Sequence, residues 1–381
     1  MSKHLFALII TPYGTAANNR GENDGNITTL QKLLWKNETH TTVSAEAIRW
    51  ALRYHWQQVD ENSVNRVWDD DKSDHKWRDR KWLGWNPDVA EAIKYVDDDV
   101  LGFMEALAAS KENDAAYAIP QRRRDLKEAV EAAAEEGDEK KIKAANKKFA
   151  DFEANLIKLE KKWQEIAQIQ PDGKDDTKQK TDSLEKEIKQ IRKAMDLKGI
   201  TLNRRGALEV TRAISLSPFA GDITFNAKSG KKGNTSLYGT ELHSTRYQYG
   251  LALTPKSLHP ATRALEIVDA VINLREVGGN HSRFLFDFSP DSVVFRWTDD
   301  FAPRMLYGFE MDAEGRVSFS EVIKKIESGD ILPGELFIGG KIAETMDQET
   351  REKLNGAVIH PGIKAVADEL KQRMSVELAN S

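Results

Sequence analysis

Two glycine-rich stretches of the chain carry side chains and amides that suit contact with a phosphate or another anion. Glycine lets a backbone approach a ligand closely, and ammonium, guanidinium and amide groups donate hydrogen bonds to oxygen. The residues concerned are Asn18, Asn19, Arg20 and Asn26 in the first stretch and Lys228, Lys231 and Lys232 in the second. Taken alone, each stretch is also typical of a solvated surface loop.

Further cations and amides lie near these stretches in the sequence. Arginine can bind a phosphate with two hydrogen bonds, which lysine cannot do. One group, at the point where a predicted helix leads into a strand, combines an amide, an imidazole and a guanidinium. The residues are Lys36, Arg49, Arg53, Arg204, Arg205, Arg246, Asn280, His281 and Arg283.

The same survey finds little that suits catalysis. His243 and His281 have no obvious carboxylate partner, and the eight histidines show no metal-ligand spacing. The chain has no cysteine, which excludes thiol catalysis, thiolate metal sites and disulfides. We therefore expect a binding protein that is not an enzyme and that uses no cofactor or metal.

The elements that must position these residues alternate between strand and helix. Ser44 is a suitable N-cap for the first helix, and an apolar stripe marks the second. We expect strands at 4–11, 208–216, 245–254, 284–288 and 292–297, helices at 44–58 and 264–274, and a long loop at 218–234. This order predicts an α+β protein with a ferredoxin-like (RRM-like) core and loop insertions.

The composition divides the chain into further parts. Of the 80 residues between positions 121 and 200, 38 are charged, and apolar residues recur there at steps of three and four, which predicts a charged helical hairpin. The expected domains are a core at 1–58 and 200–310, a Trp-rich insertion at 59–120, the hairpin arm at 121–199 and a C-terminal α/β extension at 311–381.

The net charge argues against a nucleic-acid binder only when it is averaged over the whole chain. The formal charge is −5, but residues 201–263 contain nine basic and three acidic residues. A local basic face on an acidic protein suits a subunit that binds RNA on one side and protein on the others. No apolar run is long enough to cross a membrane, so we expect a cytoplasmic protein with no membrane contact.

Three groups of residues, in this order, resemble the DevR family of CRISPR-associated backbone subunits, the type I-B relatives of the repeat-associated RNA-binding proteins. The first group is residues 18–29 (NNRGENDGNITT) with 44–50 (SAEAIRW). The second is residues 204–207 (RRGA), 217–222 (SPFAGD), 236–241 (SLYGTE) and 246–250 (RYQYG), and the third is 279–284 (GNHSRF).

The resemblance implies a guide-RNA (crRNA) binding backbone subunit of a type I Cascade complex, a ribonucleoprotein of antiviral defence. It implies several copies stacked along one RNA, other Cascade subunits as partners, and target DNA paired with the guide. The residues named above would then contact RNA phosphates and riboses, because such contacts do not depend on base sequence.

Two other functions stay open. Asp24, in a loop near basic residues, could belong to an endoribonuclease that trims repeat RNA, although a lone aspartate needs a metal or a base partner. Alternatively, the Trp-rich insertion and the helical arm could make the chain a protein-interaction scaffold.

Overall fold

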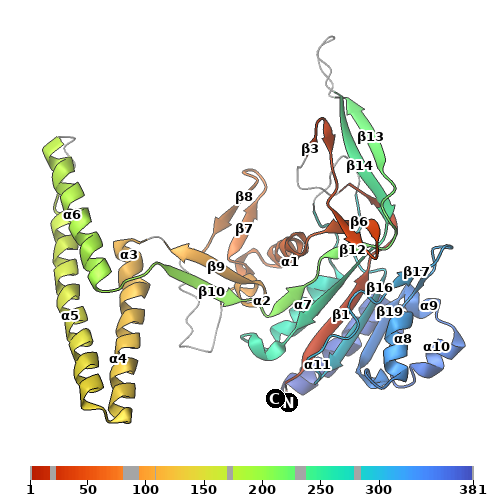
Figure 1. The fold of residues 1–381 in the computed structure, drawn as a ribbon. Helices are drawn as coiled ribbons and strands as arrows, with labels where there is room; N and C mark the ends of the chain where they lie inside the picture. The colour runs from red at the N-terminus through yellow and green to blue at the C-terminus, as the bar shows by residue number, and fades with distance from the viewer. Residues whose placement is uncertain are drawn as a thin grey trace. The chain divides into compact units, whose positions relative to one another are not determined.

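The computed structural model describes residues 2–17, 23–79, 94–107, 109–169, 175–227, 237–278 and 285–379, and it shows a mixed α/β protein (Figure 1). The chain divides into two compact units. Unit 1 contains residues Met1–Gly102 and Arg204–Ser381, and unit 2 contains Phe103–Asn203.

Most strands belong to unit 1. The strands are β1 (His4–Ile10), β2 (Gly14–Ala16), β3 (Asn23–Asp24), β4 (Ile27–Thr28), β5 (Lys32–Trp35), β6 (Glu38–Val43), β7 (Arg66–Asp69), β8 (Asp74–Trp77), β9 (Gly102–Leu107), β10 (Ile200–Arg205), β11 (Leu208–Val210), β12 (Ala213–Ser215), β13 (Asp222–Ala227), β14 (Leu237–Thr245), β15 (Tyr247–Leu253), β16 (Ser292–Thr298), β17 (Glu310–Met311), β18 (Val317–Ser318), β19 (Leu336–Gly340) and β20 (Val358–His360).

Helices come from both units. The α-helices are α1 (Ala45–Val59), α2 (Val96–Leu101), α3 (Lys111–Asn113), α4 (Ile119–Glu136), α5 (Glu139–Ala167), α6 (Asp175–Ala194), α7 (Arg263–Ile272), α8 (Ser320–Glu327), α9 (Lys341–Glu344), α10 (Gln348–Lys353) and α11 (Ile363–Ala379). Short helical turns are η1 (Glu61–Ser63), η2 (Asp114–Ala118), η3 (Pro255–Ser257) and η4 (Pro333–Glu335).

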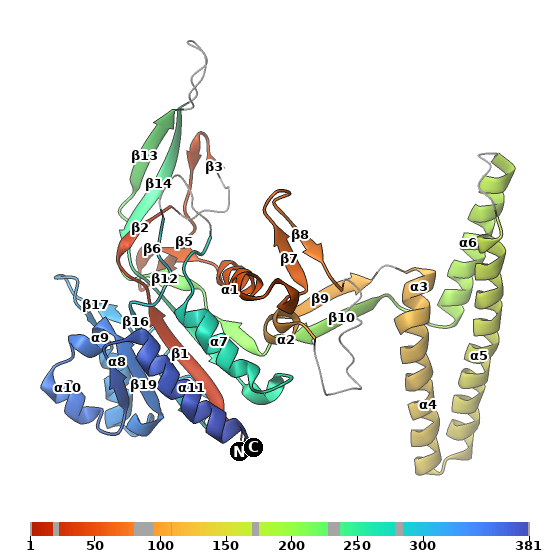
Figure 2. The same cartoon turned by 180° about the vertical axis from the view of Figure 1, so that it is seen from behind.

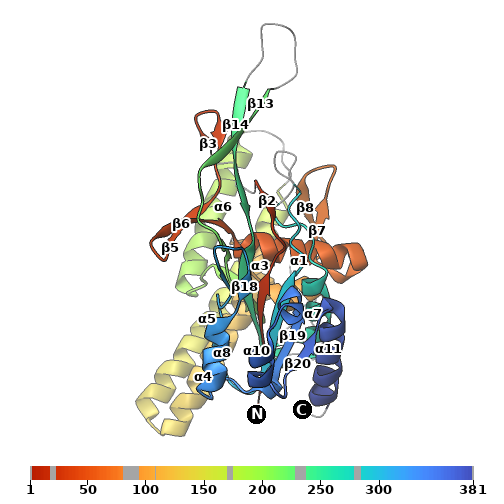
Figure 3. The same ribbon diagram turned by 90° about the vertical axis from the view of Figure 1, so that its right-hand side faces the viewer.

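The main sheet of unit 1 has the strand order β20-β19-β16-β1-β15-β12-β6-β5, with β11 also paired to β15. Every residue of β1 is buried, as expected of a central strand covered on both faces. Leu5, Ala7 and Ile9 pack with α1, α7 and α11, whereas Phe6 and Leu8 pack in a second cluster with α8 and α9. Figure 3 shows α7 and α11 on one side of β19 and α8 on the other.

The first predicted helix forms where the sequence indicates it. The Ser44 side chain accepts a hydrogen bond from the backbone N–H of Ala47, which caps α1. Ile48, Leu52 and Trp56 then lie on the buried face of α1, at steps of four residues. This packing fixes α1 on the sheet.

A second sheet of unit 1 extends from the first. Its order is β13-β14-β4-β3, with β2 also paired to β14 (Figure 2). β13 and β14 form a long antiparallel pair from Asp222↔Leu242 to Ala227↔Leu237. The sequence predicts a loop over 218–234, but Asp222–Ala227 form β13, in which Ile223 and Phe225 alternate with polar residues and pair with β14.

Unit 2 contains a helical arm in which α4, α5 and α6 follow one another. The sequence predicted a two-helix hairpin at 121–199; α5 and α6 pack against each other in this way, and α4 is a third helix because the chain also turns at Gly137. Gly137 has φ +71°, the left-handed conformation that commonly ends a helix, and Asp138 then caps α5. The buried residues of the arm form a cluster of their own that includes Phe152, Leu159 and Trp163.

Two other expectations are corrected within unit 1. Residues 285–288 form no strand, so β16 does not belong to the predicted hairpin and instead lies between β1 and β19. Residues beyond 310, expected as a separate extension, contribute β19 and β20 to the main sheet and α11 to its core.

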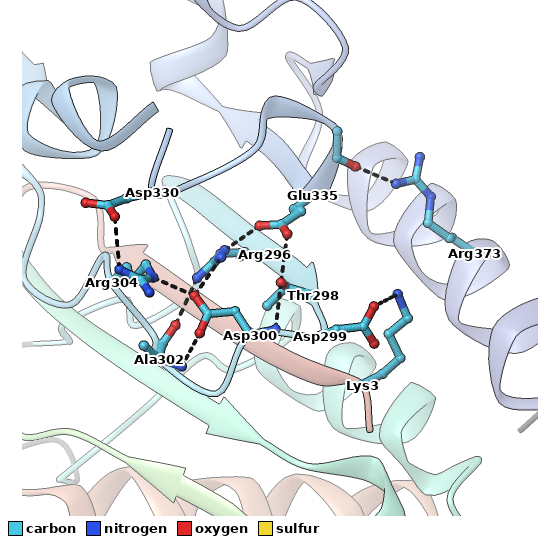
Figure 4. A network of polar contacts seen from close by, with 11 residues as sticks. Lys3, Arg296, Thr298, Asp299, Asp300, Ala302, Arg304, Asp330, Glu335 and Arg373 are labelled. Carbon is cyan, nitrogen blue, oxygen red and sulfur yellow. Dashed lines mark hydrogen bonds and ion pairs between the residues drawn. The ribbon is translucent and has the colours of Figure 1, made fainter. Parts of the chain in front are cut away.

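A buried ion-pair network joins β16 to the segment before β19 (Figure 4). The Arg296 guanidinium, whose side chain is 2% exposed, donates to Glu335 at 2.7 Å and to Asp300 at 3.1 Å. Thr298 also donates to Glu335, and Arg304 donates to Asp300. The hydrogen bond from Arg304, together with others, holds the pKa of Asp300 well below its usual range. A buried charge needs such partners, so this network fixes the geometry of the strand ends.

Candidate nucleic-acid interface

The two glycine-rich stretches singled out in the sequence emerge from one sheet. Residues 18–22 connect β2 to β3, and residues 228–236 connect β13 to β14. β2 pairs with β14 antiparallel, β4 pairs with β14 in parallel, and the Gly239 N–H donates to the carbonyl of Asn26 at 2.8 Å. The strands that flank the two stretches are therefore neighbours in the sheet, although the stretches are more than 200 residues apart in the sequence.

Side chains tie this sheet to the main sheet. On β14, Glu241 accepts hydrogen bonds from the Leu30 N–H at 2.8 Å and from the Lys32 ammonium at 2.5 Å. His243, also on β14, lies with Nδ1 2.7 Å from Thr41 Oγ1 of β6. Thr41 Oγ1 is in turn 2.8 Å from the Tyr247 hydroxyl. These contacts fix the base of the β13–β14 pair.

The environment of His243 is buried and largely uncharged. Its Nε2 lies 3.2 Å from the carbonyl oxygen of Pro218, and its ring meets that of Phe219 edge-on at 5.6 Å. Burial lowers the pKa of His243, the Pro218 hydrogen bond opposes this, and nearby His40 adds to the lowering. The lowered pKa favours the neutral imidazole at neutral pH.

The β13–β14 pair presents aromatic rings to solvent. Phe225 is 65% exposed and Tyr238 is 40% exposed. Phe225 lies opposite Gly239, and Tyr238 opposite Asn226, so the two rings occupy opposite faces of the pair. Exposed rings on such a scaffold can stack on nucleobases of any sequence.

Gly239 leaves room for one of these rings. A Cβ atom at position 239 would lie 3.0 Å from Ile27 Cγ1, 3.2 Å from Ile223 Cγ2 and 3.3 Å from Phe225 Cε1. Glycine here lets three apolar side chains, one from β4 and two from β13, pack over the backbone of β14.

Four of the predicted phosphate-binding arginines are engaged inside unit 1. Arg49 donates to the carbonyls of Leu101 and Leu208, and burial lowers its pKa. Arg53 pairs with Asp97 at 3.2 Å, and Arg246 pairs with Asp291 at 3.0 Å; each side chain is 11% exposed. Arg204, 9% exposed, pairs with Asp99. The structure thus gives all four a structural role, because their guanidinium groups already have partners.

Asp99 is the centre of one such group. Its carboxylate is fully buried and accepts from Arg204, from Arg263 at 2.8 Å and from the His259 N–H at 2.9 Å. Neighbouring Asp97 accepts from the backbone N–H groups of Asn65 and Arg66. The sequence analysis treated this acidic run only as part of the net charge.

Three predicted residues lie at the surface. Asn26 is exposed beside β14, and Lys36 is exposed in the turn between β5 and β6, where its φ is +48°. The Arg205 side chain is 86% exposed and pairs only with Glu209 among the contacts the structure describes. The remaining predictions, Asn18, Asn19, Arg20, Lys228, Lys231, Lys232, Asn280, His281 and Arg283, lie outside the described residues.

Sequence reasoning missed the residues that shape the β13–β14 pair. The positions of Phe225, Tyr238, Glu241 and His243 in this pair were not predicted, because they depend on strand pairing. The alternation of Ile223 and Phe225 with polar residues was the one pattern that could have indicated β13. In the described part of the chain, no helix is long and apolar enough to span a bilayer.

Comparison with known proteins gives one strong relative. The chain is 37% identical over 385 aligned positions to the "CRISPR-associated protein Cas7/Cst2/DevR" of Myxococcus xanthus (strain DK1622), and the alignment covers 99% of each protein. No protein-family model matches the chain.

Two solved structures are similar at a greater distance. A chain of a "CRISPR RNA-guided surveillance complex, pre-nicking" has a TM-score of 0.47 and 10% identity over 98% of this chain. A chain of a "CRISPR RNA-guided surveillance complex" has a TM-score of 0.44 and 11% identity over the same share. At these scores the likeness is too remote to support a conclusion about this chain.

Proposed function

Because the chain belongs to the Cas7/Cst2/DevR family of CRISPR-associated proteins, we propose that it is a guide-RNA-binding backbone subunit of a type I surveillance complex. Copies of the chain assemble along one guide RNA, together with other subunits of the complex, and the guide pairs with target DNA. We further propose subtype I-B, as the sequence motifs imply.

The observation that supports this proposal is that the strands flanking the two glycine-rich stretches pair with one another in one sheet. β14 pairs with both β2 and β4, which bracket the first stretch, and with β13, which precedes the second. Phe225 and Tyr238 add stacking surfaces that accept any base.

We also propose that the centre of unit 1 is a ferredoxin-like core. The order β16-β1-β15-β12, with α1 and α7 packed on the same face, supports this. In chain order these strands are fourth, first, third and second, which is the arrangement of that fold.

We propose that RNA is contacted by the predicted residues whose side chains are exposed and by those that lie outside the described residues. They are Asn18, Asn19, Arg20, Asn26, Lys36, Arg205, Lys228, Lys231, Lys232, Asn280, His281 and Arg283. Arg49, Arg53, Arg204 and Arg246 are left out of this set, because RNA would have to displace internal carboxylates or carbonyls to reach them.

The test is RNA binding by purified protein. Lys228, Lys231 and Lys232 are replaced together by alanine, and Lys256, Lys341 and Lys364, which are exposed, are replaced as a matched control. Loss of three phosphate contacts should weaken binding at least about tenfold at low salt and make it less salt-dependent, while the control stays within about twofold of wild type. Equal effects in the two variants would contradict the proposed site.

Two unrelated RNA sequences of equal length distinguish backbone contacts from base readout. Affinities within about threefold of one another are expected, since phosphates and riboses carry no sequence information. The RNA should also be recovered intact. Cleavage of a repeat hairpin that is lost on His281→Ala would favour the endoribonuclease alternative, and a wild-type protein that ignores RNA at low salt would end the proposal.

A further inference from the structure

The outer faces of α4 and α6 in the helical arm carry matching patterns of opposite charge. On α4, Leu126 is buried, and Glu128, Glu131 and Glu135 follow it by two, five and nine residues. These glutamates lie on one face of the helix, opposite Leu126, and all are exposed. We name these three residues the acidic ridge.

α6 repeats this arrangement with the opposite sign. Leu184 is buried, and Lys186, Lys189 and Lys193 follow it by the same two, five and nine residues. All three lysines are exposed, and we name them the basic ridge. Two residues before the leucine, α4 carries a basic residue, Arg124, and α6 carries an acidic residue, Asp182.

Neither ridge is neutralised inside the arm. Among the described residues, no ion pair joins any of these six side chains to another group, although other charges of the arm are paired, such as Arg123 with Glu153 and Lys162 with Glu187. Leu126 of α4 belongs to the arm's core and Ile188 and Ile191 of α6 pack against it, so each ridge points away from that core. The charges of both ridges therefore face solvent and are accessible to another molecule.

The directions of the two helices allow the ridges to match between copies. α4 is antiparallel to α5, as the pairs Arg123–Glu153 and Glu136–Lys141 require. α6 is also antiparallel to α5 (Figures 1 and 2). α4 and α6 thus run the same way, so in two copies with the same orientation the identical spacing brings each glutamate opposite a lysine.

We propose that the arm of one copy docks on the arm of the next, with the acidic ridge of α4 against the basic ridge of α6. The inference rests on the proposed function in one respect, which is that successive copies share one orientation along the RNA. Such a contact joins two different surfaces, so it leaves a free acidic ridge at one end and a free basic ridge at the other and can propagate.

Nucleic acid fits these observations less well than a second copy. A phosphate chain could bind the basic ridge, but the acidic ridge would repel it. It would also not explain why the charged residues of α4 and α6 have the same spacing. A neighbouring arm uses both ridges at once.

The experiment uses charge reversal in the full-length protein. One variant carries E128K, E131K and E135K, a second carries K186E, K189E and K193E, and a third carries all six changes. The third variant restores complementarity and keeps the net charge of −5. A control variant reverses Lys147, Lys158 and Lys161, which are exposed on α5.

Assembly is measured on a long RNA by sedimentation. Binding of one copy is measured separately, on the shortest RNA that the wild-type protein still binds. Each single-ridge variant should need at least about tenfold more protein to assemble on the long RNA, because three attractions become repulsions. The six-fold variant, and a mixture of the two single-ridge variants, should assemble within about twofold of wild type, as should the control.

The outcomes separate this inference from the proposed function. Wild-type assembly that is unchanged in both single-ridge variants overturns the inference while the function stands. Loss of RNA binding only in the basic-ridge variant and the six-fold variant shows a nucleic-acid site on α6 and overturns it as well. Failure of the wild type to bind any RNA defeats the proposed function instead.

Discussion

Thr41 Oγ1 lies 2.7 Å from Nδ1 of His243, and this contact joins the main sheet to β14, one strand of the projecting β13–β14 pair. Thr41 belongs to β6 and His243 to β14, more than 200 residues later. The contact thus helps to hold β14 against β6.

Acid should therefore destabilise unit 1 through His243. Burial lowers the folded pKa of His243 below the ordinary value of 6.5, so the unfolded chain takes up the proton first. The stability contributed by the neutral ring is complete above pH 6.5 and is lost as the pH falls through the lowered folded pKa. Denaturant unfolding between pH 8 and pH 5 should show this loss.

His243→Asn keeps a hydrogen-bonding side chain but does not titrate, and it should flatten part of that pH dependence. His4, His55 and His75, whose pKa values burial also lowers, contribute to the pH dependence as well. A variant with the full wild-type slope would show that His243 does not titrate as described.

Asp99→Ala should destabilise the protein strongly. It removes the partner of two guanidinium groups, those of Arg204 and Arg263, in a buried setting. Leaving a buried charge without its partner costs about 3–5 kcal/mol of unfolding free energy, measurable by denaturant titration. A loss below about 1 kcal/mol would mean that water replaces the carboxylate.

Arg204 and Arg205 should behave differently although they are neighbours. Arg204→Ala should lower the unfolding free energy because it breaks the Asp99 pair, whereas the exposed Arg205→Ala should change it by less than about 0.5 kcal/mol. For RNA affinity we expect the reverse, with the larger loss in Arg205→Ala. Equal RNA affinities in the folded variants would remove Arg205 from the interface.

Gly239→Val should strain the β13–β14 pair. Its side chain would have to displace Ile27, Ile223 and Phe225, and overpacking of this kind costs about 1–3 kcal/mol. Gly199→Val is the matched control, since nothing lies within 4 Å of a Cβ at that position. If both variants melted at the same temperature, the closeness of the three side chains would have no energetic effect.

Arg296→Met should cost about 1–3 kcal/mol of unfolding free energy, because Asp300 and Glu335 lose hydrogen bonds from a buried guanidinium. Arg316→Met provides the comparison: its side chain is 76% exposed in its pair with Asp312, and exposed pairs contribute about 0.2–1 kcal/mol. Similar losses in the two variants would contradict the role of burial.

Local patterns were enough to predict several elements. Ser44 and the apolar residues that follow specify α1 with its cap, and the apolar run from His4 specifies β1, because capping and burial act over a few residues. The three motifs also placed the chain in its family, which the Myxococcus xanthus relative confirms.

Partners distant in sequence decided the rest. Whether Arg204 faces RNA or Asp99, and whether Ile223 and Phe225 belong to a loop or to β13, depends on which strands and carboxylates the fold brings close. The sequence by itself determined the types of residue and the local helices and strands. Only the tertiary structure decided which charged groups are paired inside the protein and which are exposed to solvent. The reason is that burial and ion pairing arise between segments that are distant in the sequence.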